Sequence, residues 1–249
     1  MTEPLSEPSS DSGASTPAAA EARQLVLIAV VVVAVAVATY LGFQAPSGSA
    51  QLWLTLCLPT VALAAIGAFR AHKDGELGAW LRPTWGDFTR GFAVTLLLFI
   101  GAYFLVKVLA PAGTPHEAWM ARIYLQLGDP SVMRKHAPLV AFGLIAMSAA
   151  EEIVWRGLVT TLFAERFGSR RAWIFAAVAY AVAQLPAMWA LKDEAAGLNP
   201  VLPLAALGGG LVWGVLTRVY AGRVFPAIVS HALFYWSVLM MFRLWGPSV

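Results

Sequence analysis

Apolar residues dominate seven long segments of the chain, and short polar stretches separate these segments. Each segment holds about 20 mostly apolar residues, which is the length that an α-helix needs to cross a lipid bilayer. The pattern therefore predicts an all-α fold, a polytopic membrane helical bundle with about seven transmembrane helices. The predicted spans are Leu25–Phe43, Leu52–Phe69, Phe88–Leu109, Pro138–Phe163, Ala172–Leu191, Val201–Tyr220 and Val224–Leu244.

The polar stretches divide the chain into three parts. Residues 1–23 are rich in Ser, Pro, Ala and acidic residues, and no basic region precedes an apolar run, so we expect a disordered cytoplasmic tail rather than a signal peptide. Residues 24–136 hold the N-terminal transmembrane helices and loops, including a polar loop with a short interfacial helix at residues 114–138. Residues 137–246 form the core that carries the candidate chemistry. No internal repeat is visible.

Composition and charge agree with a membrane protein. The 249 residues are 59% hydrophobic and only 12% charged, whereas about a quarter of a soluble domain is charged. The net charge of +3 is small and scattered, which argues against nucleic acid as a partner. With a cytoplasmic N-terminus, ten Lys and Arg residues lie on the cytoplasmic side and six on the other, which favours this orientation. We expect a bacterial inner membrane as the location.

Three ionisable residues stand near the middle of the fourth predicted span, in the stretch AMSAAEEIVWRGLVTTLF. Charged side chains at that depth face a bundle interior or a wet cavity, and they are candidates for function. Glu152 and Arg156 are four residues apart, which favours a neutral ion pair. Glu151 points about 100° away around the helix. This arrangement leaves Glu151 as the candidate general base, although a purely structural network or a proton relay would also explain the three residues.

Two later spans carry polar residues that extend the candidate site. Gln184 lies in the middle of the fifth span and His231 about two turns into the seventh. Taken singly, each is typical of interhelical hydrogen bonding. Pro186 predicts a kink beside Gln184. Other features read as structural: three consecutive glycines favour close helix packing, and several tryptophans suit helix ends and interfaces. These are Gly208, Gly209 and Gly210, and Trp189, Trp213, Trp236 and Trp245.

Taken together, these motifs resemble the CPBP family of intramembrane proteases, which includes the type II CAAX prenyl endopeptidases. The resemblance rests on EEIVWRGLV, on the Leu-Pro element after Gln184 and on GGGLVWGVLTRVYAGRVFPAIVSHAL, and it covers about Ala137 to Trp245. It implies a helical bundle that encloses a conical catalytic chamber facing the cytoplasm. It also implies that the first Glu and a His on the next helix activate a water, while a second His and an Asn stabilise the oxyanion.

Transfer of these roles to the present chain is incomplete. Glu151 matches the base, and Glu152 with Arg156 matches the accompanying pair. The Phe-x-x-x-His pattern appears as Tyr180 to Gln184, and His-x-x-x-Asn appears as His231 to Tyr235. Gln184 can orient a water but holds no proton, and a Tyr hydroxyl is a chemically reasonable replacement for Asn as an oxyanion donor.

The resulting hypothesis is an endopeptidase that cleaves a membrane-associated protein near its C-terminus, within the lipid bilayer. Candidate substrates are CAAX-like, leader or sorting tails. The predicted site contains Glu151, Glu152, Arg156, Gln184, His231 and Tyr235. No cofactor is expected, because a catalytic zinc needs three protein ligands and these helices carry one His. Two alternatives remain open: a catalytically impaired relative that binds substrates or partners, and a proton-coupled transporter. The sequence leaves the oligomeric state undetermined.

Overall fold

A computed structural model of the chain describes residues 17–241, and over this range the protein is all-helical without a β-sheet. Six helical segments are long and apolar enough to cross a membrane, and a seventh, Phe225–Met241, is shorter. All seven predicted apolar segments are thus mainly helical over the residues that the structure describes, which end at Met241. The six are Glu21–Gln44, Ala50–Lys73, Asp87–Leu109, Ala137–Phe167, Ser169–Ala190 and Val201–Val219.

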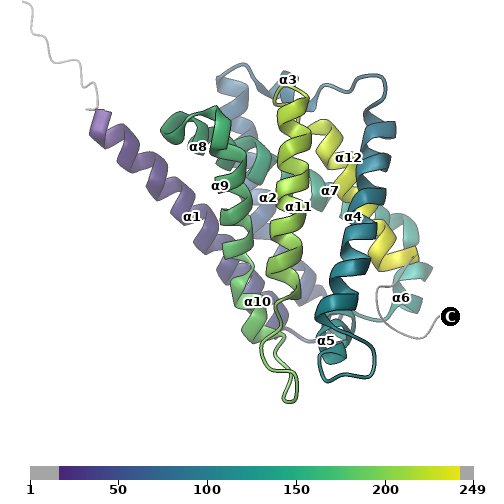
Figure 1. The fold of residues 1–249 in the computed structure, drawn as a ribbon. Coiled ribbons are helices and arrows are strands. Elements are labelled where there is room, and N and C mark those ends of the chain that lie inside the picture. Colours follow the sequence, from purple (N-terminus) through teal and green to yellow (C-terminus); the bar gives the residue numbers. More distant parts are fainter. Residues whose placement is uncertain (1–16, 242–249) are drawn as a thin grey trace, which may run out of the picture.

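Fourteen helical elements make up the described part of the chain (Figure 1). They are α1 (Pro17–Gln44), α2 (Ala50–Lys73), α3 (Leu77–Leu81), α4 (Asp87–Leu109), α5 (Glu117–Leu127), α6 (Pro130–Lys135), α7 (Ala137–Glu152), η1 (Ile153–Val159), α8 (Thr160–Phe167), α9 (Ser169–Ala183), α10 (Leu185–Ala190), α11 (Val201–Val219), α12 (Phe225–Trp236) and η2 (Ser237–Met241). The loop predicted at residues 114–138 carries two short helices, α5 and α6.

The N-terminal boundary differs from the prediction. Helix α1 begins at Pro17, so the last part of the expected tail is helical. The sequence there, AAAEAR, consists mainly of strong helix formers and runs directly into an apolar span. Residues 1–16, for which a disordered tail was also predicted, lie outside the described residues.

Two spans are not continuous α-helices. The fourth consists of α7, the π-helical turn η1 and α8. The fifth breaks between α9 and α10 at Gln184, which caps the end of α9, and Pro186 follows in the first turn of α10. A proline has no backbone N–H and its ring clashes with the preceding turn, so the predicted kink beside Gln184 is confirmed.

The last two long helices pack against different neighbours. Helix α11 lies along α9, and α12 lies along α4 and α7 (Figure 1). Glycines allow the close approach of α11 and α9. A Cβ added at Gly210 would lie 3.0 Å from the Cβ of Ala177, and one at Gly214 would lie 3.2 Å from the Trp173 ring. Close packing at the predicted glycine stretch is therefore confirmed for Gly210.

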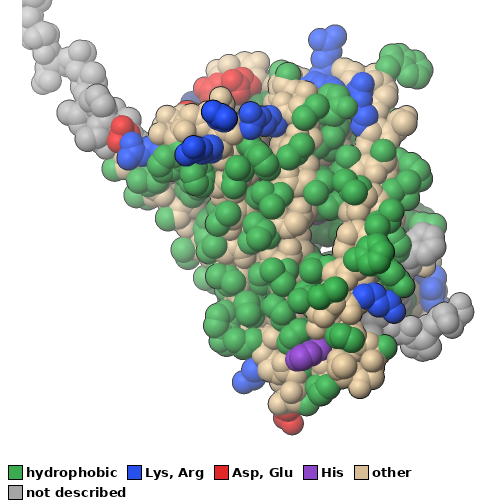
Figure 2. All heavy atoms as spheres, in the orientation of Figure 1, with side chains coloured by type: hydrophobic (Ala, Val, Ile, Leu, Met, Phe, Trp, Pro, Cys, Tyr) green, Lys and Arg blue, Asp and Glu red, His purple; other side chains and the backbone are tan. Residues whose placement is uncertain are grey.

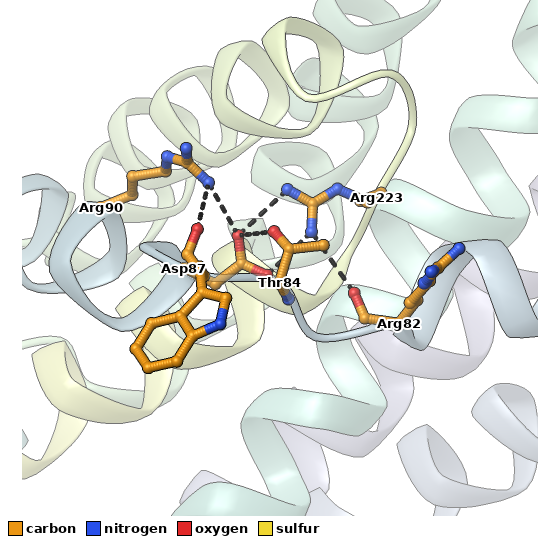
Figure 3. A network of polar contacts seen from close by, with 6 residues as sticks. Arg82, Thr84, Asp87, Arg90 and Arg223 are labelled. Carbon is orange, nitrogen blue, oxygen red and sulfur yellow. Dashed lines mark hydrogen bonds and ion pairs between the residues drawn. The ribbon is translucent and has the colours of Figure 1, made fainter.

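A buried carboxylate fixes the start of α4 to the turn between α11 and α12 (Figure 3). Asp87 is fully buried and accepts hydrogen bonds of 2.8 and 3.0 Å from the Arg223 guanidinium, and one of 3.1 Å from Arg90. The backbone N–H of Thr84 adds a bond of 2.7 Å. These bonds to Asp87 raise the pKa of Arg223. Since α4 packs along α12, this network also holds α12 in place.

Charged residues gather at one end of the molecule, while apolar side chains cover its middle (Figure 2). We call this the basic end, because the ends of α2, α8, α9 and α11, the start of α4 and the turns after α3 and α11 carry eight arginines. Contacts between these elements include Arg70 with Glu165 at 2.6 Å and Arg218 with the Arg170 carbonyl at 2.7 Å. The arginines of the basic end are Arg70, Arg82, Arg90, Arg166, Arg170, Arg171, Arg218 and Arg223. This arrangement is typical of a membrane protein whose apolar belt faces lipid.

Candidate active site

Three helical elements bring the candidate residues together at the centre of the bundle. Glu151 and Glu152 are the last two residues of α7, Arg156 belongs to η1, and His231 and Tyr235 lie one turn apart on α12. The π-helix begins directly after Glu152. Wide turns of this kind are rare and occur frequently at functional sites. The first four of these residues are buried, and Tyr235 is half-buried.

Glu152 is the fixed carboxylate of the site. Its Oε1 atom lies 2.7 Å from Nδ1 of His231 and 3.2 Å from Nη1 of Arg156. Its side chain is completely buried, and its Oε2 has no hydrogen-bond partner among the described residues. Arg156 also lies over the rings of Tyr180 and Trp213, at 5.3 and 5.2 Å from the ring centroids. Glu152 is thus held between a cation and an imidazole.

Glu151 is held more loosely, and on one side only. Its Oε2 accepts a 2.8 Å hydrogen bond from the Tyr235 hydroxyl and lies 3.3 Å from Nε2 of His231. Its side chain remains 9% exposed, whereas that of Glu152 is 0% exposed. The Oε1 atom of Glu151 has no hydrogen bond to a described residue. Of the two carboxylates, Glu151 therefore has an oxygen available to a water.

Because His231 contacts both carboxylates, hydrogen-bond chemistry limits where protons can lie on His231, Glu151 and Glu152. A neutral imidazole has one N–H donor and one acceptor nitrogen, while an ionised carboxylate only accepts. If Nδ1–H of a neutral His231 donates to Glu152, then Nε2 carries no proton and lies 3.3 Å from Oε2 of Glu151 without a hydrogen bond between them. A proton on either of these two groups removes the repulsion between two acceptors. With Arg156 charged and Glu152 ionised, the four groups are then neutral together, whether that proton is on His231 or on Glu151. Neutrality lowers the cost of burying these charges.

An aromatic side chain covers His231 from the neighbouring span. The Trp213 ring stacks on the imidazole with centroids 3.8 Å apart and planes 22° apart. Its Nε1–H donates a 3.1 Å hydrogen bond to Oγ of Ser230, and Thr95 of α4 donates a 3.0 Å bond to the Ser230 carbonyl. The ring plane of His231 is therefore fixed from α11 and α4 as well as by Glu152.

The position of Trp213 corrects the expectation that it belongs to a helix end. It is 3% exposed and lies well inside α11, because its ring fills the space beside His231. Sequence reasoning also missed Ser230 and Thr95. A tryptophan in the interior of a glycine-rich span was the one available signal, since interfacial tryptophans lie near span ends. Trp245 lies outside the described residues.

Gln184 does not join the network. It stands at the break between α9 and α10, is half-buried, and its side chain makes no hydrogen bond to any described residue. The structure therefore brings together five of the six predicted site residues: Glu151, Glu152, Arg156, His231 and Tyr235. Gln184 forms no hydrogen bond or ion pair with these five residues. Among residues 17–241, no group of three or more His, Cys, Asp and Glu side chains is arranged to hold a metal ion.

Fold and site together define a class of protein. The chain is an integral membrane protein, an all-helical bundle with a glutamate–histidine cluster buried between its spans. Residues 134–237 match the family described as "Type II CAAX prenyl endopeptidase Rce1-like", and this part of the chain is a domain of that family. The five clustered residues all lie inside the matched region. No curated protein and no solved structure matches the chain.

Proposed function

We propose that the protein is an intramembrane endopeptidase that hydrolyses a peptide bond of a membrane-associated protein near its C-terminus. One observation carries the proposal: the Glu151 carboxylate, whose side chain is 9% exposed, lies beside a buried histidine that also contacts a second, charge-paired carboxylate. Membership of the endopeptidase family supports peptide hydrolysis as the reaction. The basic end then faces the cytoplasm, as the distribution of Lys and Arg favours.

In this proposal, Glu151 acts as the general base. With the shared proton on His231, the Glu151 carboxylate takes a proton from a water as the water oxygen attacks the scissile carbonyl carbon. The C–O bond forms, and the carbonyl oxygen becomes an oxyanion. Glu151 then passes its proton to the leaving nitrogen as the C–N bond breaks, so that the products are an acid and an amine.

His231 and Tyr235 supply hydrogen-bond donors next to this carboxylate. In the unliganded protein, both groups face Oε2 of Glu151. Catalytic hydrogen bonds commonly rearrange when substrate binds, and an oxyanion formed beside Glu151 would accept from either group. Glu152 and Arg156 orient His231 and balance its charge. This differs from the role that the family resemblance implies for a histidine at position 184, because here His231 is the group that holds the proton.

Gln184 favours a second candidate function, namely a catalytically impaired family member that binds membrane proteins without cleaving them. Its side chain cannot hold a proton, and it forms no hydrogen bond with a described residue. The two functions make different predictions for a Glu151→Gln variant, which keeps the shape of the side chain and removes the base.

The decisive experiment compares protein C-termini in the membrane proteome of four strains. A deletion strain receives wild-type protein, Glu151→Gln, Glu194→Gln or no protein. Glu194 is an exposed loop glutamate and serves as the matched control. We expect processed termini with wild type and Glu194→Gln, and unprocessed termini with Glu151→Gln and in the deletion. If Glu151→Gln matches wild type and both differ from the deletion, the binding function is correct and the protease proposal is wrong.

A further inference from the structure

A second site lies outside the glutamate–histidine cluster, at the basic end. A cavity of about 470 Å³ opens there between α3, η1, α8, α9 and α11. Arg156 forms part of its wall, together with polar residues from three helices that meet at this end. Those that the argument uses are Ser169 and Trp173 of α9, and Thr217 and Arg218 of α11. We call it the arginine cavity. A volume of this size is typical of sites for small organic ligands.

The arginine cavity extends from Arg156 to the ends of three spans. Its lining includes the first turn of the span that begins at Ser169 and the last turn of the span that ends at Val219. It also includes Ala164, close to the end of the span at Phe167. Because helices of this length cross the apolar part of a bilayer, their ends reach the polar headgroup layer.

Two arginines line this cavity, and they differ in their partners: Arg156 pairs with Glu152 at 3.2 Å, whereas Arg218 has no acidic partner among the described residues. Other arginines at the basic end are paired. Arg70 pairs with Glu165 at 2.6 Å, Arg166 with Glu21 at 2.6 Å, and Arg223 with Asp87. In contrast, none of Arg170, Arg171 and Arg218 forms an ion pair with a described carboxylate. Arg218 donates to the Arg170 carbonyl, which places its guanidinium beside the start of α9.

Two further groups around the cavity favour an anion. Thr217 is 6% exposed, and its hydroxyl has no hydrogen-bond partner among the described residues. Helix α9 follows Gly168, which has no side chain to cap the helix, so the first N–H groups of α9 lack a side-chain acceptor. Uncapped helix N-termini attract phosphate groups through these N–H donors and the helix dipole. The acidic residue of the lining, Glu76, is exposed.

We propose that the arginine cavity binds a phosphate group, and that this phosphate belongs to the headgroup of an anionic lipid. Arg218 provides the principal positive charge, the start of α9 provides backbone donors, and Trp173 provides an aromatic wall at the interface. Free phosphate offers the same chemistry without the lipid. The site is distinct from the one proposed for catalysis, and the two share only Arg156.

The test measures the stability of the purified full-length protein in detergent as lipid is added. Mixed micelles contain either phosphatidylglycerol or zwitterionic phosphatidylcholine, and a separate series contains inorganic phosphate against chloride at equal ionic strength. Four proteins are compared: wild type, Arg218→Gln, Ala164→Phe, which fills the cavity without changing charge, and Arg122→Gln. Arg122 is an exposed arginine on α5, paired with Asp193, and serves as the control.

We expect phosphatidylglycerol to raise the unfolding temperature of wild type and Arg122→Gln more than phosphatidylcholine does. Arg218→Gln should weaken the apparent lipid affinity by about fivefold, the effect of one arginine near an anionic surface. Ala164→Phe should also weaken it, and this variant decides the matter if Arg218→Gln does not fold. If inorganic phosphate stabilises wild type but neither Arg218→Gln nor Ala164→Phe, the cavity is a phosphate site whose ligand is free phosphate from solution.

Three results would overturn the proposal. They are equal stabilisation by both lipids, equal lipid affinity in Arg218→Gln and Arg122→Gln, and stabilisation by a peptide with a free C-terminal carboxylate but by neither source of phosphate. The last result would reassign the cavity to peptide binding. The readout is stability rather than cleavage, so the outcome does not depend on whether the protein is a protease.

Discussion

The Nδ1 atom of His231 lies 2.7 Å from Oε1 of Glu152, the same oxygen that lies 3.2 Å from Nη1 of Arg156. One carboxylate oxygen therefore links the end of α7, the π-helical turn and α12. The two adjacent glutamates therefore differ in their contacts. Glu152 contacts both the cation and the imidazole, while one oxygen of Glu151 has no hydrogen bond to a described residue, as the proposed function requires of a general base.

The first prediction separates the two glutamates by stability. Glu152→Gln leaves Arg156 without its counter-ion in a buried place, and removal of one partner of a buried pair commonly costs about 3–5 kcal/mol. Glu151→Gln should cost much less, because the ion pair of Arg156 is with Glu152 and the amide can still accept a hydrogen bond from Tyr235. Thermal unfolding in detergent measures both variants against wild type. Equal unfolding temperatures for the two variants would contradict the division of roles.

The second prediction concerns the hydroxyl of Tyr235. Tyr235→Phe removes the O–H that donates to Glu151 and keeps the ring, which contacts His231 with centroids 4.3 Å apart. If the proposed function is correct, kcat should fall by about a hundred- to a thousand-fold, the usual effect of losing one such donor. Tyr40→Phe, at an exposed position on α1, should leave kcat unchanged. A Tyr235→Phe protein that cleaves at the wild-type rate would exclude Tyr235 from the reaction.

Much of this architecture could be predicted from the sequence, because the bilayer requires long apolar segments and penalises charge. The seven helical segments follow from this requirement, and the pairing of Glu152 with Arg156 follows from their i, i+4 spacing. Close packing at Gly210 and the break before Pro186 follow equally from local chemistry.

The contacts of His231 could not be predicted, because they depend on how distant helices pack. Nothing local in the sequence shows that one imidazole contacts both glutamates, or that Trp213 stacks on it from another span. The π-helical turn after Glu152 leaves no sequence signature either. It coincides with Gly157, whose lack of a Cβ makes room for the Trp80 ring.

The third prediction tests this packing at Gly157. An added Cβ would overlap the Trp80 ring, so Gly157→Ala should destabilise the protein by about 1–3 kcal/mol, as overpacked cores commonly do. Gly143 of α7 is the matched control, because no atom lies within 4 Å of an added Cβ there. Gly143→Ala should be neutral or stabilising by about 0.5–1 kcal/mol. Thermal unfolding of both variants decides the matter, and a stable Gly157→Ala protein would show that Trp80 can move aside.

The fourth prediction is a pH dependence in the loop between α10 and α11. The backbone N–H groups of Ala195 and Ala196 donate to Asp193 and hold the pKa of its carboxyl below the ordinary value of 3.8. A lowered pKa in the folded state means that the stabilisation is complete above pH 3.8 and is lost as the pH falls below it. At pH 6, Asp193→Asn should therefore be cut in this loop faster than wild type by limited proteolysis. The difference should become smaller as the pH is lowered through the folded-state pKa of Asp193, and a difference that does not change with pH would contradict the charge-based explanation.

The last prediction addresses Gln184, the predicted site residue that forms no hydrogen bond with the cluster. The family resemblance implies a histidine there, and a histidine can hold a proton whereas glutamine cannot. General acid–base groups commonly contribute about 10²–10⁴-fold to a rate. If the protein is a protease slowed by this replacement, Gln184→His should raise cleavage above the wild-type rate, and the double variant Gln184→His with Glu151→Gln should be inactive. Leu185→His, one position along and on the exposed side of the same break, controls for an added imidazole. If Gln184→His leaves cleavage unchanged, the proton is handled by Glu151 and His231 alone, as the contact between these two residues favours.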